Sequence, residues 1–304
     1  MVKALVSGEF DDAVGQEILG LTPQIEVIGY DPNETVLTEE QSVAEVLVAP
    51  YRNSRRPIRL VPILPRLRMV QLLSAGTDDW VGHVPTHVAL AGARGAHAGP
   101  VSEWVLSAIL TQFRQWPTLL RFQEQGVWAH RKFNADTIDG KRVLVVGAGS
   151  IGTMVAHRLT AFGARATLVA RNARPGVYPT TELSHLIAGH QIVVITTPLT
   201  AETDAMVDSA FLAAMDDGAL LVNAARGRIV DTDALVAELT RGRLLAALDV
   251  TEPEPLPKDH PLWNCPGLIL SPHSARTVPG TNLLCYQVAA EQIANFVGRD
   301  STEP

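Results

Sequence analysis

Val143-Leu-Val-Val-Gly147-Ala-Gly149-Ser-Ile-Gly152 is the stretch that decides the fold of this 304-residue chain. Its glycines follow the spacing G-x-G-x-x-G, with an apolar strand predicted before them and a helix after them. In that context Gly147 allows a tight turn, Gly149 admits a pyrophosphate, and Gly152 lets the helix pack closely on the strand. The amides at the helix N-terminus add partial positive charge towards the phosphates. The stretch therefore predicts a dinucleotide-binding loop.

On both sides of this loop, short β-branched runs alternate with helical patterns, which is typical of a parallel sheet flanked by helices. The segment 101–116 has apolar residues at helical spacing and lies between the breakers Gly99-Pro100 and Pro117. We therefore expect an α/β protein with a doubly wound parallel sheet around the glycine loop. The further predicted strands are 3–7, 25–28, 45–48, 67–73, 141–146, 166–169, 191–196, 219–223, 244–249 and 268–271, and the further predicted helices are 151–162 and 283–297.

Composition excludes several classes of protein. A net charge of −7 argues against a nucleic-acid binder, whose surface would be basic. Cys265 and Cys285 are too few for a disulfide framework, and Pro85 between His83 and His87 disfavours a shared metal-binding face, so no metal site is expected. The start of the chain does not read as a signal peptide, and no apolar run is long enough for a membrane span. We expect a cytoplasmic protein that binds neither nucleic acid nor membrane.

The position that contacts the adenosine ribose carries no acid. In an NAD site, a carboxylate about 20 residues beyond the glycines accepts a hydrogen bond from the ribose 2′-hydroxyl. Here the strand 166–169 leads into Ala170-Arg171-Asn172-Ala173-Arg174. Arg171, with Arg174 as a second candidate, offers charge-assisted hydrogen bonds to a 2′-phosphate. This favours NADP(H) over NAD(H), although a solvated loop arginine is the alternative interpretation of Arg171.

Three polar segments follow predicted strands nearer the C-terminus. They contain Arg226, then Asp249 with Glu254, then His273. Ligands of a doubly wound sheet bind beyond the carboxyl ends of its strands. A guanidinium can hold a carboxylate, an imidazolium can donate a proton, and a carboxylate can orient that imidazole. Together these groups supply what the reduction of a ketone requires.

At this point the sequence resembles the D-isomer-specific 2-hydroxyacid dehydrogenase family. The resemblance covers most of the chain, and the ordered set of motifs is more specific than any one of them. The motifs are the loop Gly147–Gly152, Thr197-Pro198-Leu199-Thr200, Asn223-Ala-Ala-Arg226-Gly-Arg-Ile-Val-Asp231, Asp249-Val-Thr-Glu-Pro-Glu254-Pro and Ser271-Pro-His273, with weaker matches at Ser74-Ala75-Gly76 and Ala93-Arg94-Gly95.

The resemblance implies the catalytic roles. Arg226 would bind and polarise a 2-oxo acid, and His273 would be the general acid and base. Glu254 would pair with His273 by motif register, and Glu252 is the neighbouring alternative because the family's usual aromatic residue is replaced by Thr251.

The resemblance also implies the binding residues. The amides around Ala75 and Gly76, together with Arg226 and His273, would bind the substrate. The expected cofactor-binding residues are Gly147, Gly149, Ser150, Ile151, Gly152, Arg171, Thr197, Pro198, Ala224, Ala225, Asp249 and Ser274, with Asp249 on the nicotinamide carboxamide.

The family layout implies two domains. Residues 1–95 and 277–304 would form a discontinuous, flavodoxin-like substrate domain, and residues 96–276 the inserted dinucleotide-binding domain. The helix 101–116 and the arm after it resemble the family's dimerisation region, which predicts a homodimer, although they can equally pack within one chain.

Three functions remain open at this stage. The first is an NADP(H)-preferring reductase of small 2-oxo acids, of the glyoxylate or hydroxypyruvate type. The second is phosphoglycerate dehydrogenase or another NAD-dependent D-2-hydroxyacid dehydrogenase. The third is a non-catalytic dinucleotide-sensing protein, because a fold by itself does not establish catalysis.

Overall fold

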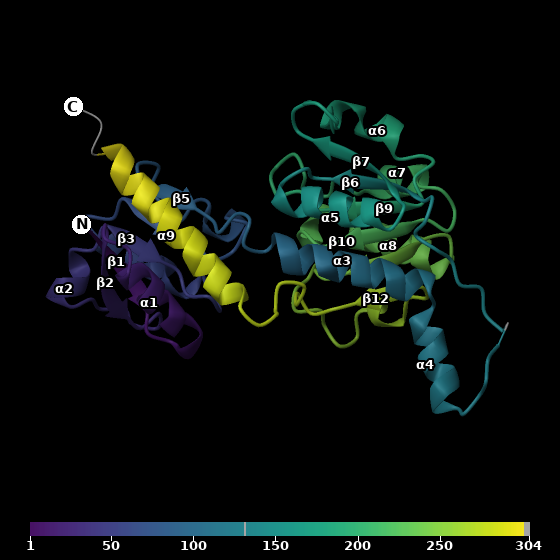
Figure 1. Ribbon diagram of the computed structural model, residues 1–304, viewed down its shortest axis with the longest axis horizontal. Coiled ribbons are helices and arrows are strands. Elements are labelled where there is room, and N and C mark those ends of the chain that lie inside the picture. The colour runs from purple at the N-terminus through teal and green to yellow at the C-terminus, as the bar shows by residue number, and fades with distance from the viewer. Residues whose placement is uncertain (131, 301–304) are drawn as a thin grey trace. The chain divides into compact units, whose positions relative to one another are not determined.

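The computed structural model describes residues 1–130 and 132–300, which form two compact units (Figure 1). The larger unit is Ala98–Thr277, and the smaller unit combines Met1–His97 with the segment that begins at Val278. Each unit contains one sheet in which the paired strands are parallel. The predicted α/β class with a doubly wound sheet is confirmed.

The strand order of the larger unit creates the dinucleotide-binding edge. Its order is β12-β11-β10-β9-β6-β7-β8, so the chain runs outward in one direction from β6 and then in the other from β9. Ligands of such sheets bind at this reversal, beyond the carboxyl ends of β6 and β9. The bounds are β6 (Arg142–Val146), β7 (Arg165–Ala170), β8 (Val177–Pro179), β9 (Ile192–Ile195), β10 (Leu220–Asn223), β11 (Leu245–Leu248) and β12 (Leu268–Leu270).

Helices cover both faces of this sheet. Alternate residues of β6 point to opposite faces, as a strand requires: Val143 and Val145 join one hydrophobic cluster, Leu144 and Val146 the other. The first face is covered by α3 (Ala98–Phe113) and α5 (Ser150–Ala161), and the second by α6 (Leu183–Leu186), α7 (Ser209–Ala214) and α8 (Thr232–Thr240). Burial on both faces explains why these strands read as almost continuous apolar runs. The helix α4 (Trp116–Glu124) instead projects from the unit (Figure 1).

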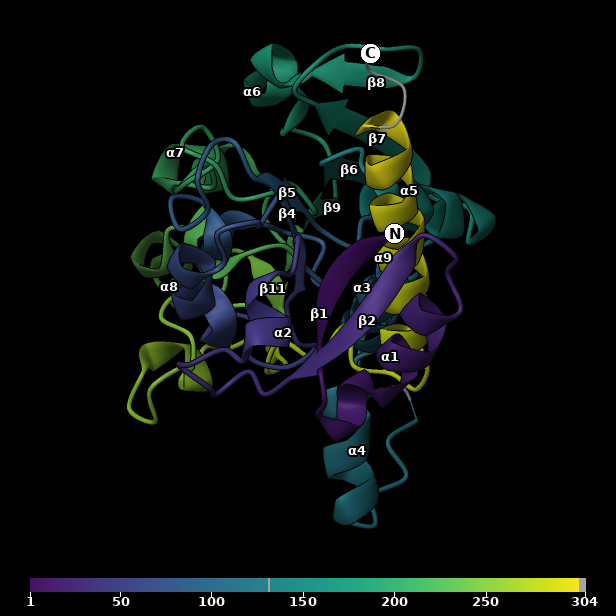
Figure 2. The same ribbon diagram turned by 90° about the vertical axis from the view of Figure 1, so that its left-hand side faces the viewer.

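The smaller unit has a sheet of order β2-β1-β3-β4-β5. Figure 2 shows β1 and β2 side by side, with α1 close to α9. The two helices meet where Gly15 lies against the ring of the buried Tyr286, so that a larger residue at position 15 would overlap the ring. The bounds are β1 (Val2–Ser7), α1 (Ala13–Gly20), β2 (Ile25–Tyr30), α2 (Glu39–Ser42), β3 (Val46–Val48), β4 (Met69–Gln71), β5 (Ala89–Ala91) and α9 (Thr281–Asp300).

Some of these elements were not expected from the sequence. The strand β5 is Ala-Leu-Ala, which has no β-branched residue, and α1 has only eight residues, two of them glycine. Tertiary packing therefore stabilises elements whose local propensity is weak. Short 3-10 helices occur at Phe10–Asp12, Arg56–Ile63, Asp78–Trp80, Thr180–Glu182, Gly227–Ile229 and Pro261–Asn264.

Within residues 1–130 and 132–300, no helix is both long and apolar enough to cross a membrane. The same residues contain no group of three or more His, Cys, Asp or Glu side chains arranged to hold a metal ion.

Candidate active site

The glycine loop has the shape that a dinucleotide requires. Gly147 has a φ of +112°, and a Cβ on it would lie 2.6 Å from the backbone nitrogen of Thr197. A Cβ on Gly152 would overlap the carbonyl oxygen of Gly147. A Cβ on Gly149, by contrast, would meet no atom within 4 Å. Packing within the protein therefore requires glycine at positions 147 and 152, whereas Gly149 borders open space at the N-terminus of α5. Sheets of this kind bind a pyrophosphate at that position.

The residues around the loop hold its shape. Thr196, directly after β9, donates a hydrogen bond from Oγ1 to the Gly147 carbonyl at 2.8 Å. Arg174 donates to the carbonyl of Ala148 from the turn that follows β7. The predicted residues adjoin this loop, because Ser150 and Ile151 begin α5 and Thr197 and Pro198 follow Thr196.

Arg171 lies at the carboxyl end of β7, where the ribose of a dinucleotide is expected. Its side chain is 72% exposed, and its Nη2 is 3.4 Å from Oε2 of Glu202. An ion pair this exposed is weak, so the guanidinium can rearrange towards another anion.

Three neighbouring strands carry the predicted catalytic residues. Arg226 follows β10, Glu254 follows β11 and His273 follows β12, and these strands are adjacent in the sheet. Glu254 accepts a hydrogen bond from His273, and Arg226 is near enough for its charge to lower the pKa of the same carboxylate, while its own Nη1 donates to the carbonyl of Ala225 (2.8 Å). The residues are up to 47 positions apart in sequence (273 − 226 = 47) but share one edge of the sheet.

The His273–Glu254 hydrogen bond joins Nδ1 to Oε1 at 2.6 Å. This bond lowers the pKa of Glu254 below its ordinary value, and the charges of His273 and Arg226 lower it further against the opposing effect of partial burial. The ionised carboxylate accepts a hydrogen bond from Nδ1–H, so Nε2 is the ring nitrogen left to exchange a proton with a substrate.

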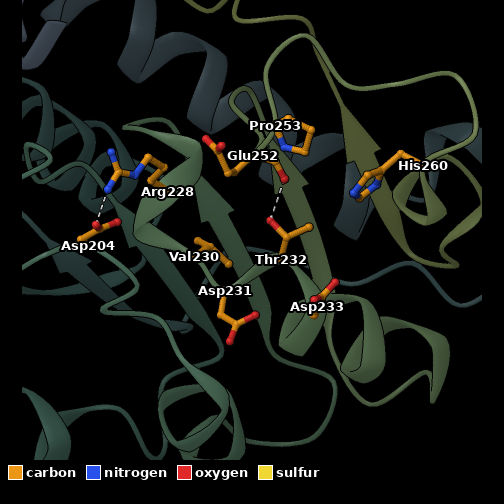
Figure 3. Close-up of a pocket in the computed structure, with 9 residues that line it drawn as sticks. All are labelled: Asp204, Arg228, Val230, Asp231, Thr232, Asp233, Glu252, Pro253 and His260. Carbon is orange, nitrogen blue, oxygen red and sulfur yellow. Dashed lines mark hydrogen bonds and ion pairs between the residues drawn. The ribbon is translucent and has the colours of Figure 1, made fainter.

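Of the two acids that the sequence left open, Glu254 is the one that contacts His273. Glu252 instead lines a pocket of about 440 Å³ together with Arg228, Thr232 and His260 (Figure 3). Its backbone carbonyl accepts a hydrogen bond from Thr232 Oγ1 at 3.0 Å.

A tight turn after β10 positions Arg226. The buried Asn223 accepts a hydrogen bond from the amide of Ala225 (3.0 Å) and donates to the carbonyl of Arg226 (2.9 Å). Ala224 and Ala225, both half-buried, form the turn itself. Gly227 then runs so close to the backbone of Thr251 that a Cβ would overlap it.

Asp249 holds the loop that carries His273. It is 3% exposed, and its Oδ1 accepts hydrogen bonds from Ser271 Oγ (2.6 Å) and the amide of Ser274 (2.8 Å), while both oxygens accept from the amide of Ala275 (3.1 Å each). Its backbone carbonyl accepts from the amide of His273 at 2.7 Å. These bonds fix His273 at a φ of +51°, a left-handed conformation that is costly for a non-glycine residue. The contacts of Asp249 in this structure are thus with the catalytic loop.

In the smaller unit, the loop after β4 contains the predicted substrate-binding amides. Ser74 Oγ donates to the carbonyl of Gly76 at 2.7 Å, which closes a tight loop around Ala75. Gly92 approaches this loop so closely that a Cβ would lie 2.8 Å from the Ser74 carbonyl oxygen. Within the described residues, no backbone hydrogen bond is donated by the amides of Ala75 and Gly76.

Comparison with known proteins agrees with this arrangement. Residues 106–275 match the family model described as D-isomer specific 2-hydroxyacid dehydrogenase, NAD binding domain. The chain belongs to the D-isomer specific 2-hydroxyacid dehydrogenase family. It is accordingly an NAD(P)-dependent D-2-hydroxyacid dehydrogenase, an enzyme that binds small hydroxy or oxo acids, and a non-catalytic role is not supported.

Two curated relatives and one solved structure illustrate the likeness of this dehydrogenase to others. It is 32% identical over 255 residues to glyoxylate/hydroxypyruvate reductase A of Serratia proteamaculans, covering 79% of each chain. It is 33% identical over 218 residues to D-3-phosphoglycerate dehydrogenase of Mycobacterium tuberculosis, covering 69% of this chain and 41% of that one. The solved D-isomer specific 2-hydroxyacid dehydrogenase of Xanthobacter autotrophicus Py2, in complex with NADPH and MES, aligns with a TM-score of 0.77 at 27% identity, over 100% of this chain and 96% of that one.

Several supporting residues of this dehydrogenase carried no role in the sequence interpretation. Asn223 and Ser271 lie within the sequence motifs of Arg226 and His273. This closeness in sequence could have identified them as supporting residues. Thr196 and Gly92 gave no local signal, because their contacts come from other strands of the sheets.

Proposed function

We propose that this dehydrogenase reduces small 2-oxo acids of the glyoxylate and hydroxypyruvate type to D-2-hydroxy acids and prefers NADP(H). The observation that carries the proposal is the His273–Glu254 pair beside Arg226, at the carboxyl ends of three adjacent strands. Relatives named glyoxylate/hydroxypyruvate reductase support the substrate class.

In this mechanism His273 donates a proton to the forming alkoxide. Glu254 accepts the Nδ1 hydrogen bond, which orients the ring so that Nε2 faces the substrate oxygen. A bound nicotinamide would supply the hydride that C2 of the substrate accepts. In the oxidation direction, His273 accepts the proton of the 2-hydroxyl group instead.

Arg226 binds and polarises the 2-oxo acid. Its guanidinium stabilises the negative charge that develops on the substrate oxygen during hydride transfer. The turn held by Asn223 fixes the backbone of Arg226, so this charge is in place before the reaction.

Arg171 is the basis of the proposed NADP(H) preference. It follows β7 at the ribose position, where an NAD-specific enzyme carries an acid, and its exposed guanidinium can pair with a 2′-phosphate. The relative from Xanthobacter autotrophicus was solved in complex with NADPH, which supports the binding of this cofactor.

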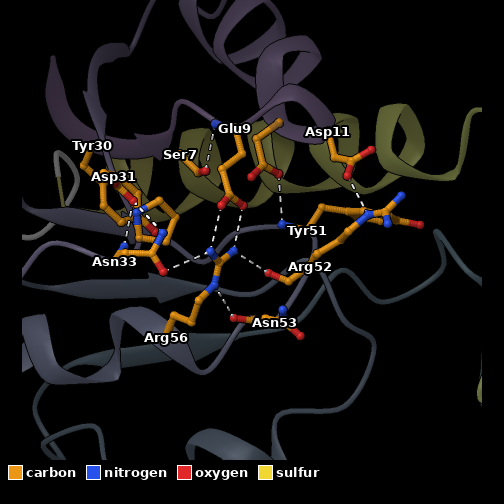
Figure 4. A network of polar contacts seen from close by, with 12 residues as sticks. Ser7, Glu9, Asp11, Tyr30, Asp31, Asn33, Tyr51, Arg52, Asn53 and Arg56 are labelled. Atoms are coloured by element: carbon orange, nitrogen blue, oxygen red, sulfur yellow. Dashed lines mark hydrogen bonds and ion pairs between the residues drawn. The ribbon is translucent and has the colours of Figure 1, made fainter.

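The loop 51–56 of the smaller unit carries three arginines. Each of them has an acidic partner, and Figure 4 shows the partners of Arg52 and Arg56. The side chains of Arg52 and Arg55 are about as exposed as that of Arg171, so these two guanidinium groups can likewise rearrange towards another anion. The pairs are Arg52–Asp11 (2.5 Å), Arg55–Asp79 (3.7 Å) and Arg56–Glu9 (2.6 Å).

We further propose that the enzyme is a homodimer joined through α4 and the arm after it. None of the nine α4 residues is buried, and Trp116 (50% exposed) and Leu120 (49%) lie one turn apart on one face. Trp128 in the arm is 91% exposed. A helix of nine residues is marginal on its own, so a second copy of the chain that covers this face would stabilise it.

Initial rates with NADPH and NADH against glyoxylate, hydroxypyruvate, pyruvate and 3-phosphohydroxypyruvate test the proposal. We expect the highest kcat/KM with NADPH and one of the first two acids. His273→Ala should lower kcat by roughly 10²–10⁴ and leave dinucleotide affinity nearly unchanged. His157→Ala, an exposed histidine of α5, is the matched control and should retain activity.

Either of two results would overturn the proposal. Comparable turnover in wild type and His273→Ala would remove His273 from the mechanism. A higher kcat/KM with NADH, or with the phosphorylated acid, would refute the assigned cofactor preference or substrate class.

A further inference from the structure

The ion pair between Arg171 and Glu202 spans the dinucleotide-binding edge of the larger sheet. Arg171 follows β7, and Glu202 lies in the loop that follows β9. The strand between β7 and β9 is β6, which leads into the glycine loop. The pair therefore joins the loops that follow β7 and β9, which lie on either side of the glycine loop, at the reversal of strand order where a dinucleotide binds.

The carboxylate of Glu202 is held in this place by its own loop. Thr200 Oγ1 donates to Glu202 Oε2 at 2.7 Å, which is the oxygen that faces Arg171. Thr203 braces the turn, because its Oγ1 accepts from the amide of Thr200 (2.8 Å) and donates to the carbonyl of Pro198 (2.7 Å). The hydrogen bond from Thr200 lowers the pKa of Glu202, and the charge of Arg171 acts in the same direction. Glu202 is therefore an anion at neutral pH.

This position supplies the carboxylate that the sequence lacks after β7. The ribose acid of NAD-specific sheets comes from the end of the second strand, and here that stretch reads Ala170-Arg171-Asn172. Glu202 reaches the same neighbourhood from a different strand, as its contact with Arg171 shows. An anion there repels a 2′-phosphate and can accept a hydrogen bond from a 2′-hydroxyl.

We propose that Glu202 is a second cofactor-specificity residue, which opposes Arg171 by disfavouring the 2′-phosphate of NADP(H) and favouring the 2′-hydroxyl of NAD(H). The inference rests on the proposed function only in placing the adenosine ribose beside Arg171. It predicts that the enzyme uses both cofactors and that the balance of these two side chains sets the ratio.

Equilibrium binding of NADP⁺ and NAD⁺, each titrated calorimetrically without a 2-oxo acid, tests the inference independently of turnover. In Glu202→Gln, the ratio of the NAD⁺ dissociation constant to the NADP⁺ dissociation constant should rise about three- to tenfold, because one negative charge beside the phosphate is lost. The rise should shrink at high salt, since both groups are exposed to solvent.

Two further variants separate the possible outcomes. Glu103→Gln removes an exposed acid that pairs with Arg158 in the same unit, so it is the matched control and should leave the ratio unchanged. Arg171→Ala should lower the ratio. If Arg171→Ala lowers it while Glu202→Gln leaves it unchanged, the inference on Glu202 is wrong and the proposed NADP(H) preference stands.

Further combinations of results for these variants also test the inference on Glu202. If Glu202→Gln raises the ratio and Arg171→Ala does not lower it, the inference stands and the assigned role of Arg171 fails. If Glu202→Gln weakens both cofactors equally, or shifts the thermal unfolding temperature without altering the ratio, Glu202 only shapes its loop and the inference is overturned.

Discussion

Replacing the second and third glycines of the loop by alanine should separate cofactor binding from folding. The structure predicts opposite results for two changes only three residues apart. Gly149→Ala should leave stability almost unchanged and weaken dinucleotide binding, whereas Gly152→Ala should destabilise the larger unit.

For Gly149→Ala, the expected change in stability is small. The backbone at Gly149 has φ −79° and ψ −167°, an extended conformation open to any residue, and its Cβ would meet no atom within 4 Å. Alanine is a poorer N-cap than glycine by roughly 0.5–1 kcal/mol, but it stabilises by about 0.4–1 kcal/mol through a less flexible unfolded chain. These effects nearly cancel. The methyl group would occupy space needed by the pyrophosphate, and overlap costing about 1–3 kcal/mol weakens binding by roughly 5- to 150-fold.

For Gly152→Ala, the added Cβ overlaps the Gly147 carbonyl oxygen and lies 2.7 Å from Thr196 Oγ1. The Gly147 carbonyl is backbone in a tight turn, so α5 must move away from the strand. Alanine adds about 1 kcal/mol of helix propensity, but the overlap costs more, and we expect a net loss of about 2 kcal/mol. For a unit of this size, that loss lowers the melting temperature by about 4–8 °C.

Thermal unfolding and calorimetric titration with NAD⁺ and NADP⁺, run on both variants, measure the two effects. Wild-type affinity in a stable Gly149→Ala protein would show that the pyrophosphate binds elsewhere. A Gly152→Ala protein as stable as wild type would refute the packing argument.

Three further perturbations test the catalytic loops and the assembly. The bond to His273 holds the pKa of Glu254 below its ordinary value of 4.5, so the stability that this carboxylate contributes is present above that pH and is lost as the pH falls through the lower folded-state value. Urea unfolding of wild type and Glu254→Gln across this range should show that the difference in their free energies of unfolding shrinks with acidification. A difference that stays constant with pH would contradict the assignment. Asp249→Asn removes the charged acceptor that holds the loop 271–275, so it should lower the free energy of unfolding by about 2–4 kcal/mol and reduce kcat. Unchanged denaturant unfolding and unchanged kinetics would show that other contacts hold this loop. Trp116→Lys combined with Leu120→Lys should give a folded monomer by sedimentation velocity, and a dimer of unchanged stability would exclude α4 as the interface.

The doubly wound sheet was predictable because its signals are local. Strands buried on both faces are apolar runs, and the glycine spacing marks the turn from β6 into α5. The smaller unit was harder to predict. Its β5 and α1 have weak local propensities and form because neighbouring strands and α9 pack against them.

The site was predictable at the level of residue types but not of partners. Arg226 and His273 could be assigned because strand ends of a parallel sheet share one edge. Motif register alone favoured Glu254, and only the structure shows which acid reaches Nδ1 of His273. Asp249 was expected to face the cofactor, and its observed partners belong to the His273 loop.

The chain sequence by itself therefore determined the class of sheet, the place of the glycine loop and the chemical groups at the strand ends, because each depends on residues within a few positions of one another. Tertiary structure decided the pairing of Glu254 with His273, the left-handed backbone of His273 and the contact of Glu202 with Arg171. These features depend on contacts between segments that follow different strands. The distance between two such side chains is set by how the strands pack, and the number of residues between them in the sequence does not determine it.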